Sequence, residues 1–225
     1  VTAVGDSAFY NCQKLSGITF PDSMTYIGAR SFYNCDALTS IVIPNNVTII
    51  PSYAFYSAGN LSSVYIGSSV DSIESYAFYN CSSLNYMYVY AQKPPRLAST
   101  TSIYSSPICY IPAGSLADYQ ASSWANLVSA FVEQGQCGDN LYYTIDNGVL
   151  NITGSGTMYD YTNQTPAPWF SQRMSIHSVN LPVGVTTIGA WAFYDCDSLT
   201  YVYLPSSLAE IKNEAFYDCS YLPSI

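Results

Sequence analysis

The residue types that most often perform chemistry in proteins are sparse in this sequence. Its single histidine, His177, sits beside Ser178 with no nucleophile motif around it, and carboxylates such as Asp160 are scattered. Acid–base catalysis needs a base positioned against a reacting group, and a lone histidine is usually an ordinary surface or core residue. The chain also contains no phosphate-binding loop, no G-x-S-x-G and no H-E-x-x-H motif. We therefore expect no enzymatic activity and no cofactor.

Five of the seven cysteines occupy the same position of a repeat, and the other two lie outside it. Column members are Cys12, Cys35, Cys81, Cys196 and Cys219, with Ala58 at the equivalent place in the third unit. A position that accepts either Cys or Ala is a small buried packing site, and side chains stacked in parallel hold their Cβ atoms too far apart for a disulfide. We predict free thiols there. Cys109 and Cys137 lie outside the repeat, and the sequence leaves open whether they pair. Zinc needs clustered Cys and His at short spacing, which are absent, so no metal site is expected.

A 23-residue repeat organises most of the chain. A Phe-Tyr pair, followed by Asn, Asp or Ser and then Cys or Ala, begins at Phe9, Phe32, Phe55, Phe78, Phe193 and Phe216. An L-x-x-I-x-I pattern follows, as in Leu38 to Ile43, whose alternation predicts a short strand with Ile41 and Ile43 facing inward. Pro44 closes this strand, because proline cannot continue a ladder. The remainder of each unit is predicted to return with a short helical or 3₁₀ turn at the Ala-Phe-Tyr.

One such unit is too small to bury its own apolar face, so neighbouring units must stack into a solenoid. The consensus N-x-V-T-x-I-x-x-x-A-F-Y-x-C-x-x-L-x-x-I-x-I-P resembles the BspA-type leucine-rich repeat over residues 1–90 and about 176–225. We therefore predict an α/β repeat solenoid, a leucine-rich-repeat stack of short parallel strands, interrupted by a capping insertion with a β-hairpin. The resemblance implies a bacterial cell-surface or secreted protein that adheres to host proteins or other cells, with no single defined ligand.

Between the arrays, residues 91–175 break the period. Residues 91–136 are expected to close the first array, with a short strand over 108–112 and a helix over 116–127 preceded by an N-cap at Gly114-Ser115. Residues 137–175 are expected to open the next array with a hairpin around Asp146-Asn147-Gly148. Both segments resemble the modules with these roles in the same family.

This organisation gives four segments: an array over 1–90, a cap over 91–136, a hairpin module over 137–175 and a truncated array over 176–225. The chain begins and ends partway through a repeat, so we expect it to be a piece of a longer protein. It carries no recognisable signal peptide.

The composition excludes several partner classes. The net charge is −9 with only six Lys plus Arg, which argues against nucleic-acid binding and against docking on anionic membranes. No apolar stretch is long enough to span a bilayer, so we expect no membrane insertion of this chain.

Tyrosines supply the most informative surface feature. Outward-facing positions of the predicted strands carry Tyr65, Tyr86, Tyr88, Tyr201 and Tyr203. Exposed tyrosines give a large contact area and hydroxyl groups at low entropic cost, which favours a site for an extracellular protein or glycan. Tyrosine also simply suits strands, and this chain is rich in it throughout. A binding or adhesion module and a structural spacer within a larger surface protein are therefore both compatible with the pattern.

Overall fold

The computed structural model describes residues 1–223, so Ser224 and Ile225 at the end of the predicted second array lie outside the described residues. The chain forms two compact units, Val1–Glu133 and Gln134–Ile225. Each unit has its own hydrophobic core. Within residues 1–223, no helix combines the length and hydropathy needed to cross a membrane.

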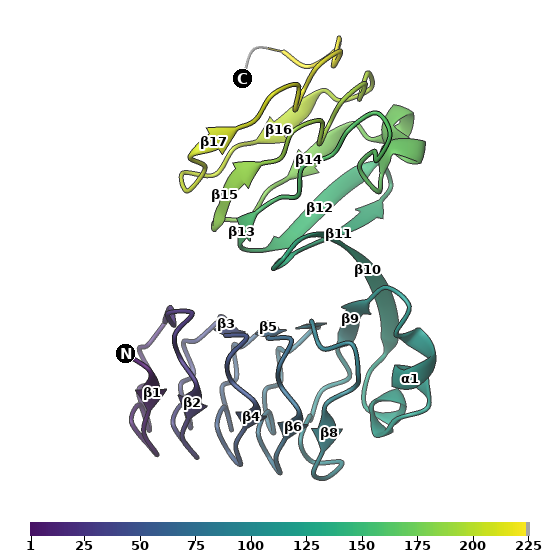
Figure 1. The fold of residues 1–225 in the computed structure, drawn as a ribbon. Helices are drawn as coiled ribbons and strands as arrows, with labels where there is room; N and C mark the ends of the chain where they lie inside the picture. Colours follow the sequence, from purple (N-terminus) through teal and green to yellow (C-terminus); the bar gives the residue numbers. More distant parts are fainter. Residues whose placement is uncertain (224–225) are drawn as a thin grey trace. The chain divides into compact units, whose positions relative to one another are not determined.

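The first unit is a solenoid whose successive turns are visible in Figure 1. Its main sheet consists of the parallel strands β3 (Ser40–Ile43), β5 (Ser63–Ile66), β7 (Tyr86–Val89) and β9 (Ile108–Pro112). On the return path lie the shorter parallel strands β1 (Ala3–Val4), β2 (Tyr26–Ile27), β4 (Ile49–Ile50), β6 (Ser72–Ile73) and β8 (Arg96–Leu97). The predicted inward residues Ile41 and Ile43 are both buried.

The core of this solenoid is a column of phenylalanines. Phe32, Phe55 and Phe78 are completely buried, and the ring centroids of neighbours are 5.3 Å apart. Cysteine thiols line the same column: Cys35 Sγ donates to the carbonyl oxygen of Phe9 at 3.1 Å, and Cys81 Sγ donates to that of Phe55 at 3.1 Å. Aromatic stacking and thiol donation therefore repeat from rung to rung.

The predicted helical or 3₁₀ turns at Ala-Phe-Tyr are consecutive hydrogen-bonded turns rather than helices. Each repeat places two residues in the left-handed region, two positions before and two positions after the Phe, as with Tyr53 (φ 61°) and Ser57 (φ 56°) around Phe55. These left-handed residues divert the chain before a helix can propagate. An L-residue held there costs roughly 1–2 kcal/mol, least for Asn and Asp.

A cap follows β9 in the first unit. The predicted helix over 116–127 is divided into α1 (Leu116–Gln120) and a 3₁₀ turn, η1 (Ser123–Asn126). Trp124 and Tyr119 are completely buried, and each is tied to the solenoid: the Trp124 indole donates to Pro95 O at 2.7 Å and the Tyr119 hydroxyl donates to Ala91 O at 2.8 Å. Ser115 is the N-cap residue, but its hydroxyl donates to Pro112 O instead of capping α1.

The second unit begins within β10 (Ala130–Gly138), which antiparallel β11 (Leu141–Asp146) follows. The predicted hairpin is present, with β12 (Val149–Gly154) paired antiparallel to β11 through Asp146 and Val149. Asn147 (φ 47°) and Gly148 (φ 75°) form the connecting two-residue turn. Two successive positive φ values match the right-handed twist of a hairpin, which explains the Asn-Gly sequence.

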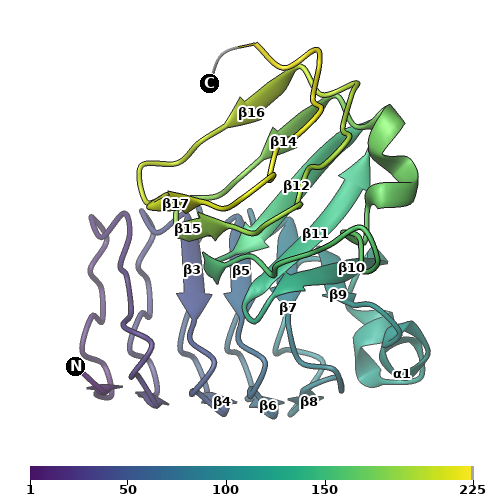
Figure 2. The same ribbon diagram turned by 45° about the horizontal axis from the view of Figure 1, so that its top comes forward.

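The hairpin leads into the second array. β12 pairs in parallel with β14 (Ser178–Asn180), and β14 pairs in parallel with β16 (Tyr201–Tyr203), as Figure 2 shows. The return path carries the parallel strands β13 (Gly156–Thr157), β15 (Val185–Ile188) and β17 (Glu210–Ile211), and the 3₁₀ turn η2 is Phe170–Ser175. Buried Trp169 stacks on Phe193 at 5.6 Å and takes the place of a repeat Phe at the start of this column. The predicted repeat solenoid is thus confirmed.

Candidate binding surfaces

The strand face of the first unit carries a ladder of stacked tyrosines. The pairing register aligns Tyr65 with Tyr88 and Tyr88 with Tyr110. Ring centroids are 4.6 Å apart for the first pair and 4.7 Å for the second, with interplanar angles of 6° and 11°. Tyr86 lies beside this ladder, 41% exposed, with its ring 6.4 Å from that of Tyr110. The structure therefore brings together Tyr65, Tyr86 and Tyr88, three of the tyrosines predicted to form a binding surface.

Tyr110 also belongs to the ladder, although it is not among the tyrosines predicted from the sequence to form a binding surface. Its rung is one residue short of the repeat, because Tyr86 pairs with Ile108 rather than with a residue 23 positions on. The sequence signal for Tyr110 is the alternation within 108–112. Cys109 and Ile111 are apolar and are buried in the structure, so Tyr110 between them lies on the outer face.

Burial by neighbouring rings raises the pKa of the Tyr65 hydroxyl, and it raises the pKa of the Tyr88 hydroxyl further. Both groups therefore stay protonated at physiological pH and present O–H donors as well as acceptors. In such an offset stack the ring faces largely cover one another, so ring edges and hydroxyls form much of the contact surface.

Tyr201 and Tyr203 lie on β16 in the second unit, 56% and 48% exposed. Their cross-strand neighbours on β14 are Ser178 and Asn180, so no tyrosine ladder continues from them. Asn180 instead donates to Asn151 Oδ1 on β12 at 2.8 Å. The two predicted groups of tyrosines thus have different surroundings, an aromatic stack in one unit and polar neighbours in the other.

A second aromatic surface lies on the turns of the first unit. The tyrosine after each repeat Phe forms a stack, with centroid distances of 4.8 Å for Tyr10–Tyr33, 4.8 Å for Tyr33–Tyr56 and 5.6 Å for Tyr56–Tyr79. This stack is flanked by a second column, in which the Tyr53 and Tyr76 rings stack at 5.0 Å.

The histidine and the scattered carboxylates form structural contacts. His177 Nε2 lies 2.9 Å from Asn147 O, within the hydrogen-bonding range, at the hairpin turn. Asp160 accepts from Lys212 Nζ at 2.8 Å and from the Ala190 N–H at 2.9 Å, and these hydrogen bonds, the Lys212 one foremost, lower its pKa. Within residues 1–223, no group of three or more His, Cys, Asp or Glu side chains is arranged to hold a metal ion.

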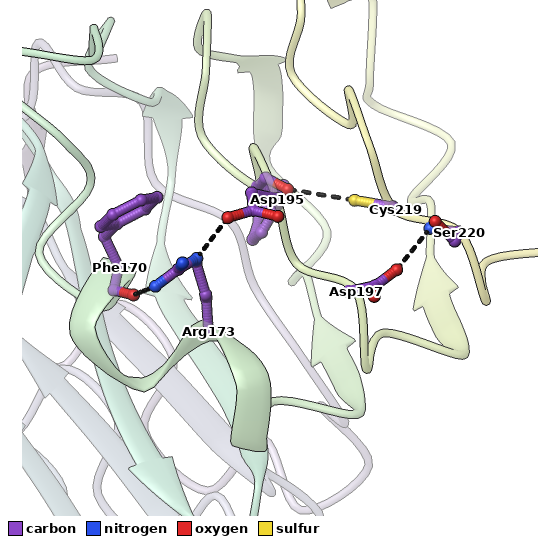
Figure 3. Close-up of polar contacts among 7 residues, drawn as sticks. Phe170, Arg173, Asp195, Asp197, Cys219 and Ser220 are labelled. Atoms are coloured by element: carbon purple, nitrogen blue, oxygen red, sulfur yellow. Dashed lines mark hydrogen bonds and ion pairs between the residues drawn. The ribbon is translucent and has the colours of Figure 1, made fainter.

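The Asp195 carboxylate is paired with Arg173 on η2 (Figure 3). Arg173 Nε donates to Asp195 Oδ2 at 2.8 Å, Nη1 donates to Phe170 O at 3.1 Å, and the guanidinium carbon lies 4.1 Å from the centre of the Phe170 ring. Asp197 nearby accepts the Ser220 N–H of the following rung at 3.2 Å. These contacts attach η2 to the array and join adjacent rungs, which is a structural role.

All seven cysteines are free, as predicted for the repeat column. Cys109 and Cys137, whose pairing the sequence left open, are both buried and belong to separate hydrophobic cores. No disulfide therefore contributes to either unit within the described residues.

Comparison with solved structures returns leucine-rich-repeat proteins at low similarity. A leucine-rich repeat protein from Bacteroides ovatus is 21% identical, with all of this chain matched to 58% of that chain and a TM-score of 0.40. A leucine rich cell surface protein from Faecalibacterium prausnitzii is 19% identical, with 99% of this chain matched to 82% of that chain and a TM-score of 0.27. A leucine-rich repeat protein from Eubacterium ventriosum is 18% identical, with 89% of this chain matched to 58% of that chain and a TM-score of 0.26.

The present chain thus spans 58% of the length of the Bacteroides protein chain. No curated protein sequence matches it. The model of the BspA type leucine rich repeat region matches six copies in this chain, over residues 1–101 and 163–225, extending beyond both predicted arrays. With most of its length matched by that model and its rungs stacked as described, the chain belongs to the BspA-type leucine-rich-repeat family.

Proposed function

We propose that this chain is a non-catalytic binding module of a cell-surface or secreted protein, and that it adheres to an extracellular protein or glycan through its tyrosine-rich strand face. The observation that carries the proposal is the ladder of Tyr65, Tyr88 and Tyr110 with Tyr86 beside it. These rings stand on adjacent strands whose backbones are locked by parallel pairing. A partner would therefore meet a rigid aromatic surface that loses little entropy on binding.

Charge and family membership support the remaining parts of the proposal. A net charge of −9 disfavours phosphate-rich partners such as nucleic acids. Membership of the BspA-type family supports a location at the cell surface or outside the cell. Tyr201 and Tyr203 offer a second, separate contact area on β16.

A screen of the purified chain against extracellular-matrix proteins and a glycan array tests the proposal. The double variant Tyr86→Ala/Tyr88→Ala removes the middle ring of the ladder and the exposed ring beside it, and its binding affinity should fall by at least tenfold, as expected for anchor aromatics. The matched control is Tyr201→Ala/Tyr203→Ala, which removes two exposed tyrosines from the other unit.

Both variants must keep the far-ultraviolet circular dichroism spectrum and urea midpoint of the parent. Equal binding by parent and Tyr86→Ala/Tyr88→Ala would exclude this face as the site. Absence of any binding partner would favour the structural spacer instead.

A further inference from the structure

The turn surface of the first unit carries a second feature that the strand face does not explain. In every repeat the residue two positions after the Phe is left-handed and is Asn, Asp or Ser, as at Asn34 and Asn80. The residue two positions before the Phe is equally left-handed, yet it is Arg30 (φ 55°), Tyr53 (φ 61°), Tyr76 (φ 61°) or Trp191 (φ 59°) in four of the repeats. Asn fits this backbone far better than Arg, Tyr or Trp.

Core packing does not account for these side chains. Tyr53 and Tyr76 are only partly covered, and Arg30 is exposed. Their neighbours are mainly each other: the Arg30 guanidinium lies 5.0 Å from the centre of the Tyr53 ring, and the Tyr53 ring stacks on that of Tyr76. The stacked rungs impose the left-handed backbone at this position in every repeat, so the unusual feature is the choice of Arg and Tyr there, and strained residues are found most often at functional sites.

Arg30 also has no ion-pair partner among residues 1–223. The ion pairs of residues 1–223 join Arg96 to Glu74, Arg173 to Asp195 and Lys212 to Asp160, and none includes Arg30. No hydrogen bond from its guanidinium to another described residue is present either. Five N–H donors in a planar fork therefore stay available, and this geometry fits a carboxylate in a bidentate arrangement.

The surroundings of Arg30 are rich in hydroxyls and amides, and the Asp6 carboxylate nearby is held by the Ala29 N–H at 2.9 Å. The adjacent stack contributes Tyr33 and Tyr56, and the column beyond it contributes Asn34, Ser57 and Asn80, with Asn80 donating to Ser57 at 3.0 Å. Protein partners usually insert an apolar anchor into a desolvated pocket. This surface instead offers ring edges and polar groups at one-rung spacing, which suits a ligand with many hydroxyls.

From these contacts we infer that the turn surface of the first unit binds a carboxylate-bearing oligosaccharide. The sugar carboxylate pairs with Arg30, and the sugar ring lies against the edges and hydroxyls of Tyr53 and Tyr76. Charge complementarity selects this occupant, because Arg30 is a cation with no ion-pair partner, whereas the neighbouring Asp6 carboxylate accepts hydrogen bonds from the Ala29 N–H and the Tyr26 hydroxyl. The site is separate from the strand face and does not depend on the function proposed for it.

The test uses variants that relieve strain while removing the contact. Arg30→Asn and Tyr53→Asn place a residue suited to left-handed backbone at each position. Ser7→Asn makes the same change one rung earlier without removing a charge or a ring. The probes are uronic-acid and sialic-acid oligosaccharides, the same sugars with their carboxylates reduced to alcohols, and a poly-glutamate peptide.

We expect acidic oligosaccharides to bind the parent, with affinity that falls as salt is raised and at least tenfold weaker binding of the reduced sugars. Arg30→Asn and Tyr53→Asn should each lose at least tenfold in affinity, whereas Ser7→Asn stays within about twofold. The urea midpoint of Arg30→Asn should equal or exceed that of the parent, which separates loss of contact from loss of fold.

Several results would overturn the inference. One is that acidic sugars do not bind, and another is that the reduced sugars bind equally well. Binding of poly-glutamate instead of the acidic sugars, or unchanged affinity of Arg30→Asn for them, would also contradict it. Loss of binding that occurs only in variants with a lowered urea midpoint would assign these side chains to stability instead.

Discussion

Cys81 Sγ donates a hydrogen bond of 3.1 Å to the carbonyl oxygen of Phe55, one rung earlier in the solenoid. The same contact joins Cys35 to Phe9 and Cys219 to Phe193. Each thiol thus fills a small space beside the phenylalanine column and satisfies a second lone pair of a Phe carbonyl. In the third repeat, Ala58 occupies this position and Phe32 O receives no thiol donor.

Completing the thiol column should stabilise the protein. In the variant Ala58→Cys, the new Sγ atom is expected to pack in the buried column and donate to Phe32 O. We expect the free energy of unfolding to rise by about 0.5–1.5 kcal/mol, from added apolar burial and one weak hydrogen bond. Urea denaturation measures this change.

The matched control for that experiment is Ala54→Cys. Ala54 is just as buried but lies in the column before the Phe. Extra volume there should cost about 1–3 kcal/mol through overpacking. Destabilisation of Ala58→Cys to the same degree as Ala54→Cys would show that the column has no room for the thiol.

The buried thiols of the native protein should react slowly with thiol reagents. Burial raises the pKa of Cys35 to about 11, and it raises the pKa of Cys81 and Cys196 to about 12. Because only the thiolate reacts, these groups should resist a disulfide reagent at about pH 8 in the native protein. In concentrated urea all seven should react.

Mass spectrometry after timed labelling identifies the modified positions. The partly exposed Cys12 serves as the internal comparison and should be labelled first. Fast native labelling of Cys81 would contradict its burial.

The cap should depend on one indole hydrogen bond. Trp124→Phe keeps most of the ring volume but removes the donor to Pro95 O, leaving a buried carbonyl unsatisfied. We expect the free energy of unfolding of the first unit to fall by about 1–3 kcal/mol. Trp191→Phe is the control, because that indole is partly exposed, and it should change stability by less than about 1 kcal/mol.

Acid should weaken the contact between Asp160 and Lys212. The pKa of Asp160 is lowered in the folded state by the Lys212 hydrogen bond and by the Ala190 N–H. Its stabilisation is therefore present above the ordinary carboxyl pKa of about 4, and it is lost as pH falls through the lower native value. Because the Asp160 side chain is about half exposed and the Lys212 side chain is partly exposed to solvent, we expect a small effect.

Urea titrations at about pH 6 and about pH 3 compare the parent with Asp160→Asn. The variant should lose less stability on acidification than the parent, because it has no carboxylate to protonate. Identical losses in the two proteins would show that this pair does not contribute to the acid response.

Local sequence patterns determined the repeating parts of this protein. Alternation of apolar residues placed Ile41 and Ile43 in the core, because a strand presents successive side chains to opposite faces. Asn147-Gly148 determined the hairpin turn, because few other pairs tolerate two positive φ angles. Free thiols followed from the interchange of Cys and Ala in one column.

Tertiary structure alone decided the positions where the period or the usual propensity fails. Tyr110 joined the tyrosine ladder because its rung is one residue short, and only strand pairing reveals that register. Tyr53 and Tyr76 adopt left-handed backbone because stacked rungs impose the same turn on every residue at that position, against intrinsic preference. Trp124 and Trp169 became core residues because the ends of a stacked column need large rings to cover the last Phe or the last rung.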